Sequence, residues 1–262
     1  IDRVLAILAG HASSSLGRRV IAELLPRPVP EAWQALERLR EVELLLRAGE
    51  EPSFAGVTDT RAVFAGGARS LDEARLVLLR AFCEAVGRFR EWFEPRAGTV
   101  PELFRVARCL PDLSPLEAAI VSVIDERGKV RDQASDLLAR LRREAAQLTE
   151  KIDKALRELL ANADVRAALS DTNIHRRGGR PVLALKAKST GRVRGIVHDR
   201  SQSEATIFIE PQEVVAPGNR LAGINLDAER EIERILLALS RLVFDDHARI
   251  TACDLRANVL GH

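Results

Sequence analysis

A chain of 262 residues with 46% hydrophobic and 30% charged residues is able to bury a sizeable core, which excludes an intrinsically disordered protein. Arg or Glu interrupts the longest apolar runs, so we expect no membrane span and no membrane partner. Three widely spaced cysteines are typical of reduced thiols rather than a disulfide framework, and we expect a cytoplasmic protein.

Residues 1–130 show helical periodicity that is interrupted by proline and glycine. Trp33, Leu36 and Leu39 recur at spacings of three within one such segment. A capping sequence with Ser70 as the cap and Glu73 reaching back predicts another helix that runs to about residue 93. This pattern predicts a helical core domain over residues 1–130.

A longer helical pattern covers residues 131–160, in which Leu138, Leu141 and Ile152 belong to a narrow apolar stripe. A second stripe begins after Pro217-Gly218 and continues to about residue 245. Two such helices predict a long antiparallel pair within 131–245, although two ordinary bundle helices remain an alternative. Residues 246–262 are expected to return to the core.

Between these helices lies the only strand-like part of the sequence, over about 174–211. Three short runs rich in Val, Ile, Leu and Thr are separated by turn-forming residues and predict strands at Pro181–Lys188, Arg192–His198 and Ala205–Glu210. Pro181 argues against a central position for the first strand, because proline cannot donate to the ladder. The predicted fold is mainly α with a small inserted antiparallel β-sheet at the tip of the two long helices.

The net charge of +2 conceals a strongly basic segment. Residues 174–200 contain one acidic residue and eight basic ones, namely Arg176, Arg177, Arg180, Lys186, Lys188, Arg192, Arg194 and Arg200. Strand alternation is expected to place Lys186, Lys188, Arg192 and Arg194 on one face of two adjacent strands. Arg176, Arg177 and Arg180 would extend this positively charged surface at the edge of the sheet.

Clustered cations repel one another, and a polyphosphate is the commonest partner that compensates them. Since no aromatic residue is interleaved and no basic recognition helix is present, we expect binding of nucleic acid through backbone phosphates with little sequence preference. The eight basic residues are therefore the candidate DNA-binding residues. A solvated basic face with no partner is the alternative.

Other chemistry has little support in the sequence. His175 and His198 lack a third ligand at metal-site spacing, so no metal site is predicted. No nucleophile motif or carboxylate cluster is apparent, so we predict no catalytic residue and no cofactor in this chain.

Three segments resemble the second branch of the bacterial MutS family. The most specific is Gly191–Pro211, within a longer match from Arg180, which is similar to the clamp signature of that family; Glu229–Leu236 resembles its returning lever helix and His11–Arg18 its N-terminal core. The sequence departs from the family pattern at Pro181, where an aromatic residue is common, at Ala184, where proline is common, and at Glu204, where glycine is common. Glu204 also places an acid close to the expected DNA face.

The resemblance implies a core and lever domain with an inserted clamp, from a homodimeric, nucleoid-associated protein that closes around duplex or branched DNA and suppresses homologous recombination. It further implies an ATPase using ATP and Mg²⁺ and a small endonuclease domain, neither of which is recognisable in these residues, so whether the chain serves an enzyme stays open. Two alternatives remain: contact with ribosomal RNA during rescue of stalled ribosomes, and a purely structural role in dimerisation.

Overall fold

The computed structural model describes residues 2–12, 15–22, 28–65 and 70–260, without the side chains of 2–4, 22, 30, 190 and 254–260. The chain divides into two compact units, the first formed by residues 1–134 and 234–262 and the second by residues 135–233. The described part is mainly helical and contains one four-stranded antiparallel sheet, which confirms the predicted fold class.

The first unit is helical throughout its described part, apart from an isolated bridge between Ile124 and Val130. Its elements are α1 (Asp2–His11), α2 (Ser15–Ala22), α3 (Val29–Arg47), α4 (Arg61–Phe64), α5 (Glu73–Phe93), η1 (Glu94–Arg96), α6 (Pro101–Arg108), α7 (Ser114–Val123), η2 (Asp132–Ala134), the end of α10 (Gln212–Asp245) and α11 (His247–Leu260).

Side chains cap the helices of this unit at two points. The Asp72 carboxylate accepts a hydrogen bond from the backbone N–H of Arg75 and so caps α5, whose Leu76, Leu79 and Phe82 are buried. The Glu41 carboxylate accepts from the first backbone N–H groups of α6, those of Glu102 and Leu103, at 3.0 and 2.8 Å. These bonds satisfy N–H groups that have no partner within their own helix.

The second unit contains the sheet and two long helical segments, one before it and one after it along the chain. Its elements are α8 (Asp136–Ala161), α9 (Ala163–Ala168), β1 (Leu169–Arg177), β2 (Arg180–Lys186), η3 (Ala187–Arg192), β3 (Gly195–Arg200), β4 (Thr206–Pro211) and the first part of α10.

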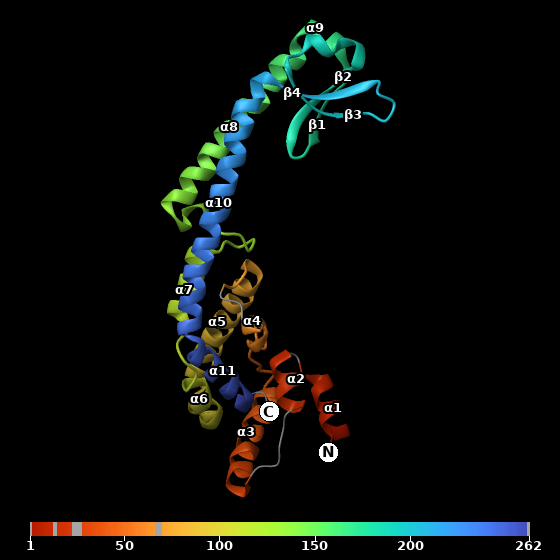
Figure 1. Ribbon diagram of the computed structural model, residues 1–262. Coiled ribbons are helices and arrows are strands. Elements are labelled where there is room, and N and C mark those ends of the chain that lie inside the picture. Colours follow the sequence, from red (N-terminus) through yellow and green to blue (C-terminus); the bar gives the residue numbers. More distant parts are fainter. Residues whose placement is uncertain (1, 13–14, 23–27, 66–69, 261–262) are drawn as a thin grey trace. The chain divides into compact units, whose positions relative to one another are not determined.

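Helices α8 and α10 run antiparallel within this unit (Figure 1). Ser135, the N-cap of α8, donates to Glu231 late in this part of α10, whereas Glu144 further along α8 pairs with Arg220 earlier in α10. The predicted start of the second helix at Pro217 is wrong, because β4 continues directly into a helix that begins at Gln212. Pro217 lies in the first two turns and removes the hydrogen bond to the carbonyl of Glu213 without ending the helix.

The strands of the sheet follow the order β1-β2-β4-β3, so β4 lies between β2 and β3 (Figure 1). One face carries Leu183, Leu185, Ile207 and Ile209, each at most 2% exposed, and packs with Ile152 and Leu156 of α8 and Val214 of α10 in one hydrophobic core. This core fixes the sheet against the two helices.

Strand β1 was not predicted, and two of the predicted strands have other bounds in the structure. The strand predicted at Pro181–Lys188 leaves the sheet after Lys186, and the one predicted at Arg192–His198 begins only at Gly195. Between them the chain forms η3, and Val193 is buried in the core with 5% exposure. Because the chain forms 3-10 turns and then buries Val193, the alternation of a strand does not continue through this segment.

Pro181 lies in a central strand, contrary to the prediction. The two-residue turn Gly178-Gly179 makes Arg177 and Arg180 a hydrogen-bonded pair, so the next pair, Arg176 and Pro181, needs no bond from the proline nitrogen. On its other side the ladder to β4 begins only at Leu183. No ladder bond is lost at Pro181.

Candidate nucleic-acid interface

The four cations that were predicted on two adjacent strands do not share a strand face. Lys186 ends β2, Lys188 and Arg192 lie in η3, and Arg194 precedes β3. Moreover β2 and β3 are separated by β4. The prediction failed because strand alternation does not extend through 3-10 turns, and because the neighbours of a strand are decided by topology rather than by chain order.

Arg180 is compensated by a buried carboxylate. Its Nη1 donates to Oε1 of Glu210 at 3.3 Å, and its Nη2 donates to Oδ1 of Asn219 at 2.6 Å. Glu210, at the end of β4, is only 2% exposed, and its Oε2 lies 2.7 Å from Nε2 of His198 on β3. Because a buried carboxylate needs such partners, Arg180 belongs to the framework that joins β2, β3, β4 and α10.

Arg177 also has a carboxylate partner. Its Nε donates to Oδ2 of Asp199 at 3.1 Å, and its guanidinium lies over the Phe208 ring at 4.1 Å. His175 contacts the same ring edge-on and hydrogen-bonds Asp171 at 3.0 Å. The backbone N–H of Asn173 and this imidazole together lower the pKa of Asp171. The charges on this face of β1 are therefore largely balanced within the unit.

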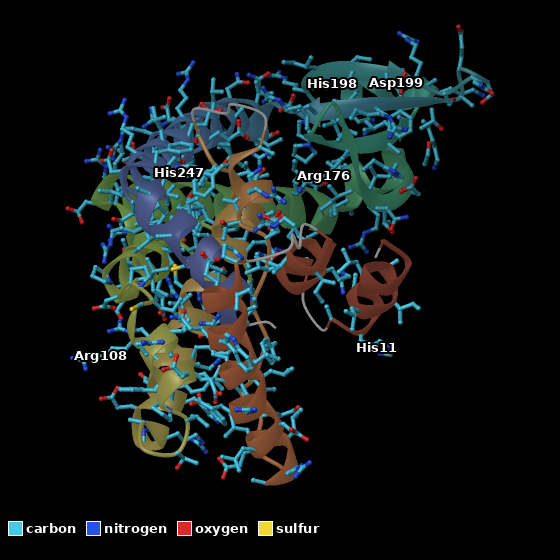
Figure 2. The ribbon with its side chains drawn as sticks, turned by 90° about the horizontal axis from the view of Figure 1, so that it is seen from below. His11, Arg108, Arg176, His198, Asp199 and His247 are labelled. Atoms are coloured by element: carbon cyan, nitrogen blue, oxygen red, sulfur yellow. The ribbon has the colours of Figure 1, made fainter. Side chains whose placement is uncertain are left out.

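Arg176 and Lys186 point to other places. Arg176 lies on the opposite face of β1 from Arg177, and its Nη1 donates to the carbonyl of Gly179 at 3.3 Å. The Nζ of Lys186 donates to the carbonyl of Ala167 in α9 at 3.1 Å. Figure 2 labels Arg176 on β1 and the neighbours His198 and Asp199 on β3, which occupy separate parts of the sheet.

Four of the eight candidates are exposed and form neither a side-chain hydrogen bond nor an ion pair with the described residues, whereas Arg176 and Lys186 donate to backbone carbonyls. We call them the η3–β3 cations, and they are Lys188, Arg192, Arg194 and Arg200. Their charges therefore face solvent. Lys188 and Arg192 lie in η3, Arg200 ends the edge strand β3, and Arg194 lies between the two elements.

The backbone that carries Lys188, Arg192 and Arg194 is fixed at both ends. The N–H of Ala187 donates to the carbonyl of Ala205 at 3.0 Å, and the N–H of Gln212 donates to the carbonyl of Arg194 at 2.9 Å. Val193 is buried between these points. A loop that is anchored in this way presents its charges with little ordering cost on binding.

Glu204, the acid expected near this surface, lies in the turn between β3 and β4. Its φ of 53° is left-handed, and its N–H donates to the carbonyl of Ser201 at 2.8 Å. A glycine adopts this conformation without strain. The side chain of Glu204 is exposed and forms no ion pair with the described residues.

Within the described part of the chain, no group of three side chains suited to metal binding occurs. In the same residues no helix combines the length and the apolar character needed to cross a membrane. Sequence reasoning missed Glu210, Asp199 and Asn219, the residues that compensate the arginines. The proximity of β4 and α10 to β2 reveals Glu210 and Asn219, and the pair between Arg177 of β1 and Asp199 of β3 reveals the third.

No protein-family model matches this chain. A protein of Bacillus subtilis named "Putative endonuclease MutS2" is 32% identical over 237 residues, which cover 88% of this chain and 30% of that protein. "Endonuclease MutS2" of Pelotomaculum thermopropionicum is 34% identical over 241 residues, 91% of this chain and 31% of the relative. "Endonuclease MutS2" of a Geobacillus strain is 33% identical over 255 residues, 92% of this chain and 32% of the relative. Along about nine-tenths of its length the chain is thus similar to MutS2 endonucleases, and it spans about three-tenths of theirs.

Proposed function

We propose that this chain is the DNA-gripping region of a MutS2-type protein, in which the sheet of the second unit acts as a clamp and α8 and α10 act as its levers. The clamp binds duplex or branched DNA through backbone phosphates, without reading base sequence. In the whole protein this grip serves the suppression of homologous recombination, and the protein is a homodimer.

The observation that carries this proposal is the set of η3–β3 cations. Exposed cations without carboxylate partners are free to neutralise phosphates, whereas Arg177 and Arg180 would first have to leave Asp199 and Glu210. The proposed contact surface is therefore narrower than the eight-residue set and lies along η3 and β3. The similarity to proteins named endonucleases favours nucleic acid over a small anion as the partner.

The direct test reverses two of these charges in the variant Arg192→Glu/Arg194→Glu and measures binding to labelled duplex and four-way-junction DNA by fluorescence anisotropy. We expect a loss of at least about tenfold in affinity, since phosphate contacts dominate non-specific binding. The matched control is Arg40→Glu/Arg47→Glu on α3, which changes the net charge equally at arginines that pair with Glu37 and Glu43.

Unchanged DNA affinity of the Arg192/Arg194 variant, or an equal loss in the control, contradicts the proposal. Ribosomal RNA fragments compete in the same assay. If they displace the DNA at much lower concentrations than unlabelled duplex does, RNA is the partner of this surface.

A further inference from the structure

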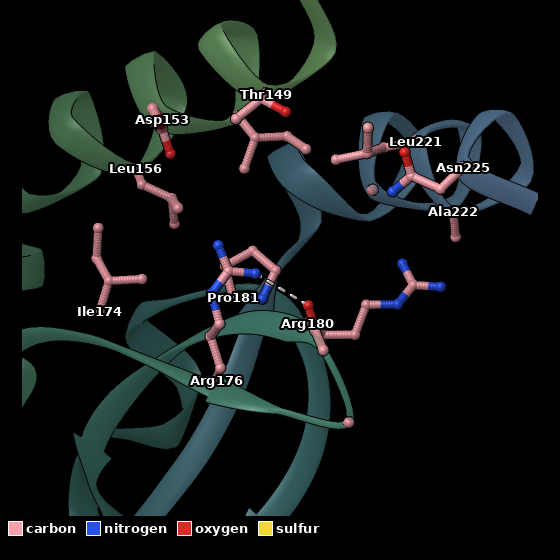
Figure 3. A pocket seen from close by; sticks show the side chains of 14 residues that line it. Thr149, Asp153, Leu156, Ile174, Arg176, Arg180, Pro181, Leu221, Ala222 and Asn225 are labelled. Atoms are coloured by element: carbon pink, nitrogen blue, oxygen red, sulfur yellow. Dashed lines mark hydrogen bonds between the residues drawn. The ribbon is translucent and has the colours of Figure 1, made fainter. Parts of the chain in front are cut away.

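A cavity of about 330 Å³ lies within the second unit, between the β1–β2 hairpin and helices α8 and α10 (Figure 3). Its residues are distinct from the η3–β3 cations. The volume is at the lower end of the range for small-molecule sites, about 300 to 1,000 Å³. It is large enough to accept one nucleobase with part of its sugar and phosphate.

Part of the wall of this cavity is apolar. Ile174 of β1 pairs with Leu183 and shares its face of the sheet, but it is 43% exposed while Leu183 is 1% exposed. Pro181 on β2 and Leu221 on α10 also line the cavity. An isoleucine left uncovered at the edge of an otherwise buried face provides an apolar surface for a flat ring.

Polar side chains also line the cavity, namely those of Thr149, Asp153, Arg176, Arg180 and Asn225. Arg180 is already bound to Glu210 and Asn219. Figure 3 shows Arg176 reaching in from β1, Asp153 from α8 and Asn225 from α10. The bond from Arg176 Nη1 to the Gly179 carbonyl leaves most of the five guanidinium donors available. The carboxylate of Asp153 and the amide of Asn225 form no hydrogen bond with other described side chains.

These groups differ in what they are able to recognise. A guanidinium that retains its donors is suited to a phosphate. The carboxylate of Asp153 is exposed and only accepts hydrogen bonds, so it favours a ligand donor over a second anionic group beside it. The cavity therefore suits a molecule that offers a phosphate to Arg176, an apolar ring to Ile174 and Pro181, and an amino group to Asp153.

We propose that this cavity binds a single unpaired nucleotide whose base carries an exocyclic amino group. Arg176 holds its phosphate, Ile174, Pro181 and Leu221 cover the base, and Asp153 accepts the amino N–H. Cytosine then binds better than thymine, which is of similar size but has a carbonyl oxygen in place of the amine. The nucleotide comes either from DNA held by the clamp, in which case the inference rests on the proposed function, or from free solution.

The first arm of the test uses three labelled duplexes with the intact protein: perfectly paired, with one bulged cytosine, and with one bulged thymine. We expect the cytosine bulge to bind about tenfold more tightly than the thymine bulge, the discrimination that one well-made base contact provides. Asp153→Asn removes the difference between the two bulges and leaves the affinity for the paired duplex unchanged. Its matched control, Glu150→Gln on the same helix, keeps the difference.

The second arm measures binding of free dCMP and dTMP by calorimetry, which requires no grip on DNA. Saturable binding of dCMP that is lost in Arg176→Ala and kept in Arg157→Ala assigns the site to free nucleotides. Preference for the cytosine bulge without dCMP binding assigns it to DNA. The inference is overturned if both bulges bind equally and neither nucleotide binds, or if Asp153→Asn keeps the cytosine preference.

The two proposals fail separately. If the Arg192→Glu/Arg194→Glu variant loses paired duplex but still binds dCMP, both stand. If no duplex binds while dCMP does, the proposed function fails and the nucleotide site stands.

Discussion

At the scale of single residues, Gly195 permits the close approach of β3 to β4. A Cβ at this position would lie 2.0 Å from the carbonyl oxygen of Glu210 and 2.8 Å from Cγ2 of Ile209. Backbone cannot yield as a flexible side chain does, so any larger residue must push β3 away. The same strand carries His198, which hydrogen-bonds the buried Glu210.

Replacement of this glycine is therefore expected to destabilise the sheet. Gly195→Ala should lower the free energy of unfolding by about 1 to 3 kcal/mol, the usual cost of overpacking, as measured by urea denaturation. Gly191→Ala is the control, because its Cβ would meet no atom within 4 Å. Equal stability of the two variants would show that β3 is not held as closely as described.

The thiols of the first unit are expected to differ in reactivity. Burial raises the pKa of Cys83 to about 12, so at pH 8 only about one ten-thousandth of it is the reactive thiolate. Cys253 is buried as well, whereas Cys109 is exposed. We expect the disulfide reagent DTNB to label Cys109 rapidly in the native protein between pH 7 and 9, and Cys83 and Cys253 only after unfolding. Rapid native labelling of Cys83, identified by peptide mass, would contradict this.

At the scale of elements, the β1–β2 hairpin depends on its two-residue turn. Gly178 and Gly179 have φ values of 56° and 78°, the pattern of a type I′ turn, whose twist matches that of the strands. No atom lies within 4 Å of a Cβ at either position, so conformation rather than space selects glycine here. This turn sets the register that opposes Ile174 to Leu183.

Two substitutions of Gly178 should separate conformation from size. Asparagine tolerates the left-handed region, so Gly178→Asn is expected to leave the urea midpoint nearly unchanged. Gly178→Val should cost about 1 to 2 kcal/mol, because a β-branched residue is strained at this φ. A valine variant as stable as the asparagine variant would argue against the type I′ turn.

At the scale of the whole molecule, charge placement matters more than net charge. The chain has a net charge of only +2, yet eight of its basic residues lie within residues 174–200. Half of these eight form ion pairs or hydrogen bonds within the second unit. The effective charge offered to a polyanion is thus set by the four η3–β3 cations.

Salt dependence measures this effective charge. If these four cations contact phosphates, log K for duplex DNA should fall with log salt concentration at a slope of about −3 to −4. Arg192→Ala/Arg194→Ala should reduce the steepness by about 2. A slope near −7 would mean that the compensated arginines also contact DNA, and a slope near zero would remove the phosphate-binding role.

The sequence by itself determined the fold class and the two long apolar stripes, because these follow from local periodicity. It also located the basic segment, since charge is a property of composition. Only the tertiary structure decided which cations are free. Glu210 and Asn219 follow Arg180 by 30 and 39 residues, and the insertion of β4 between β2 and β3 brings these partners together. Strand order and the burial of Val193 are long-range packing outcomes, which no local pattern encodes.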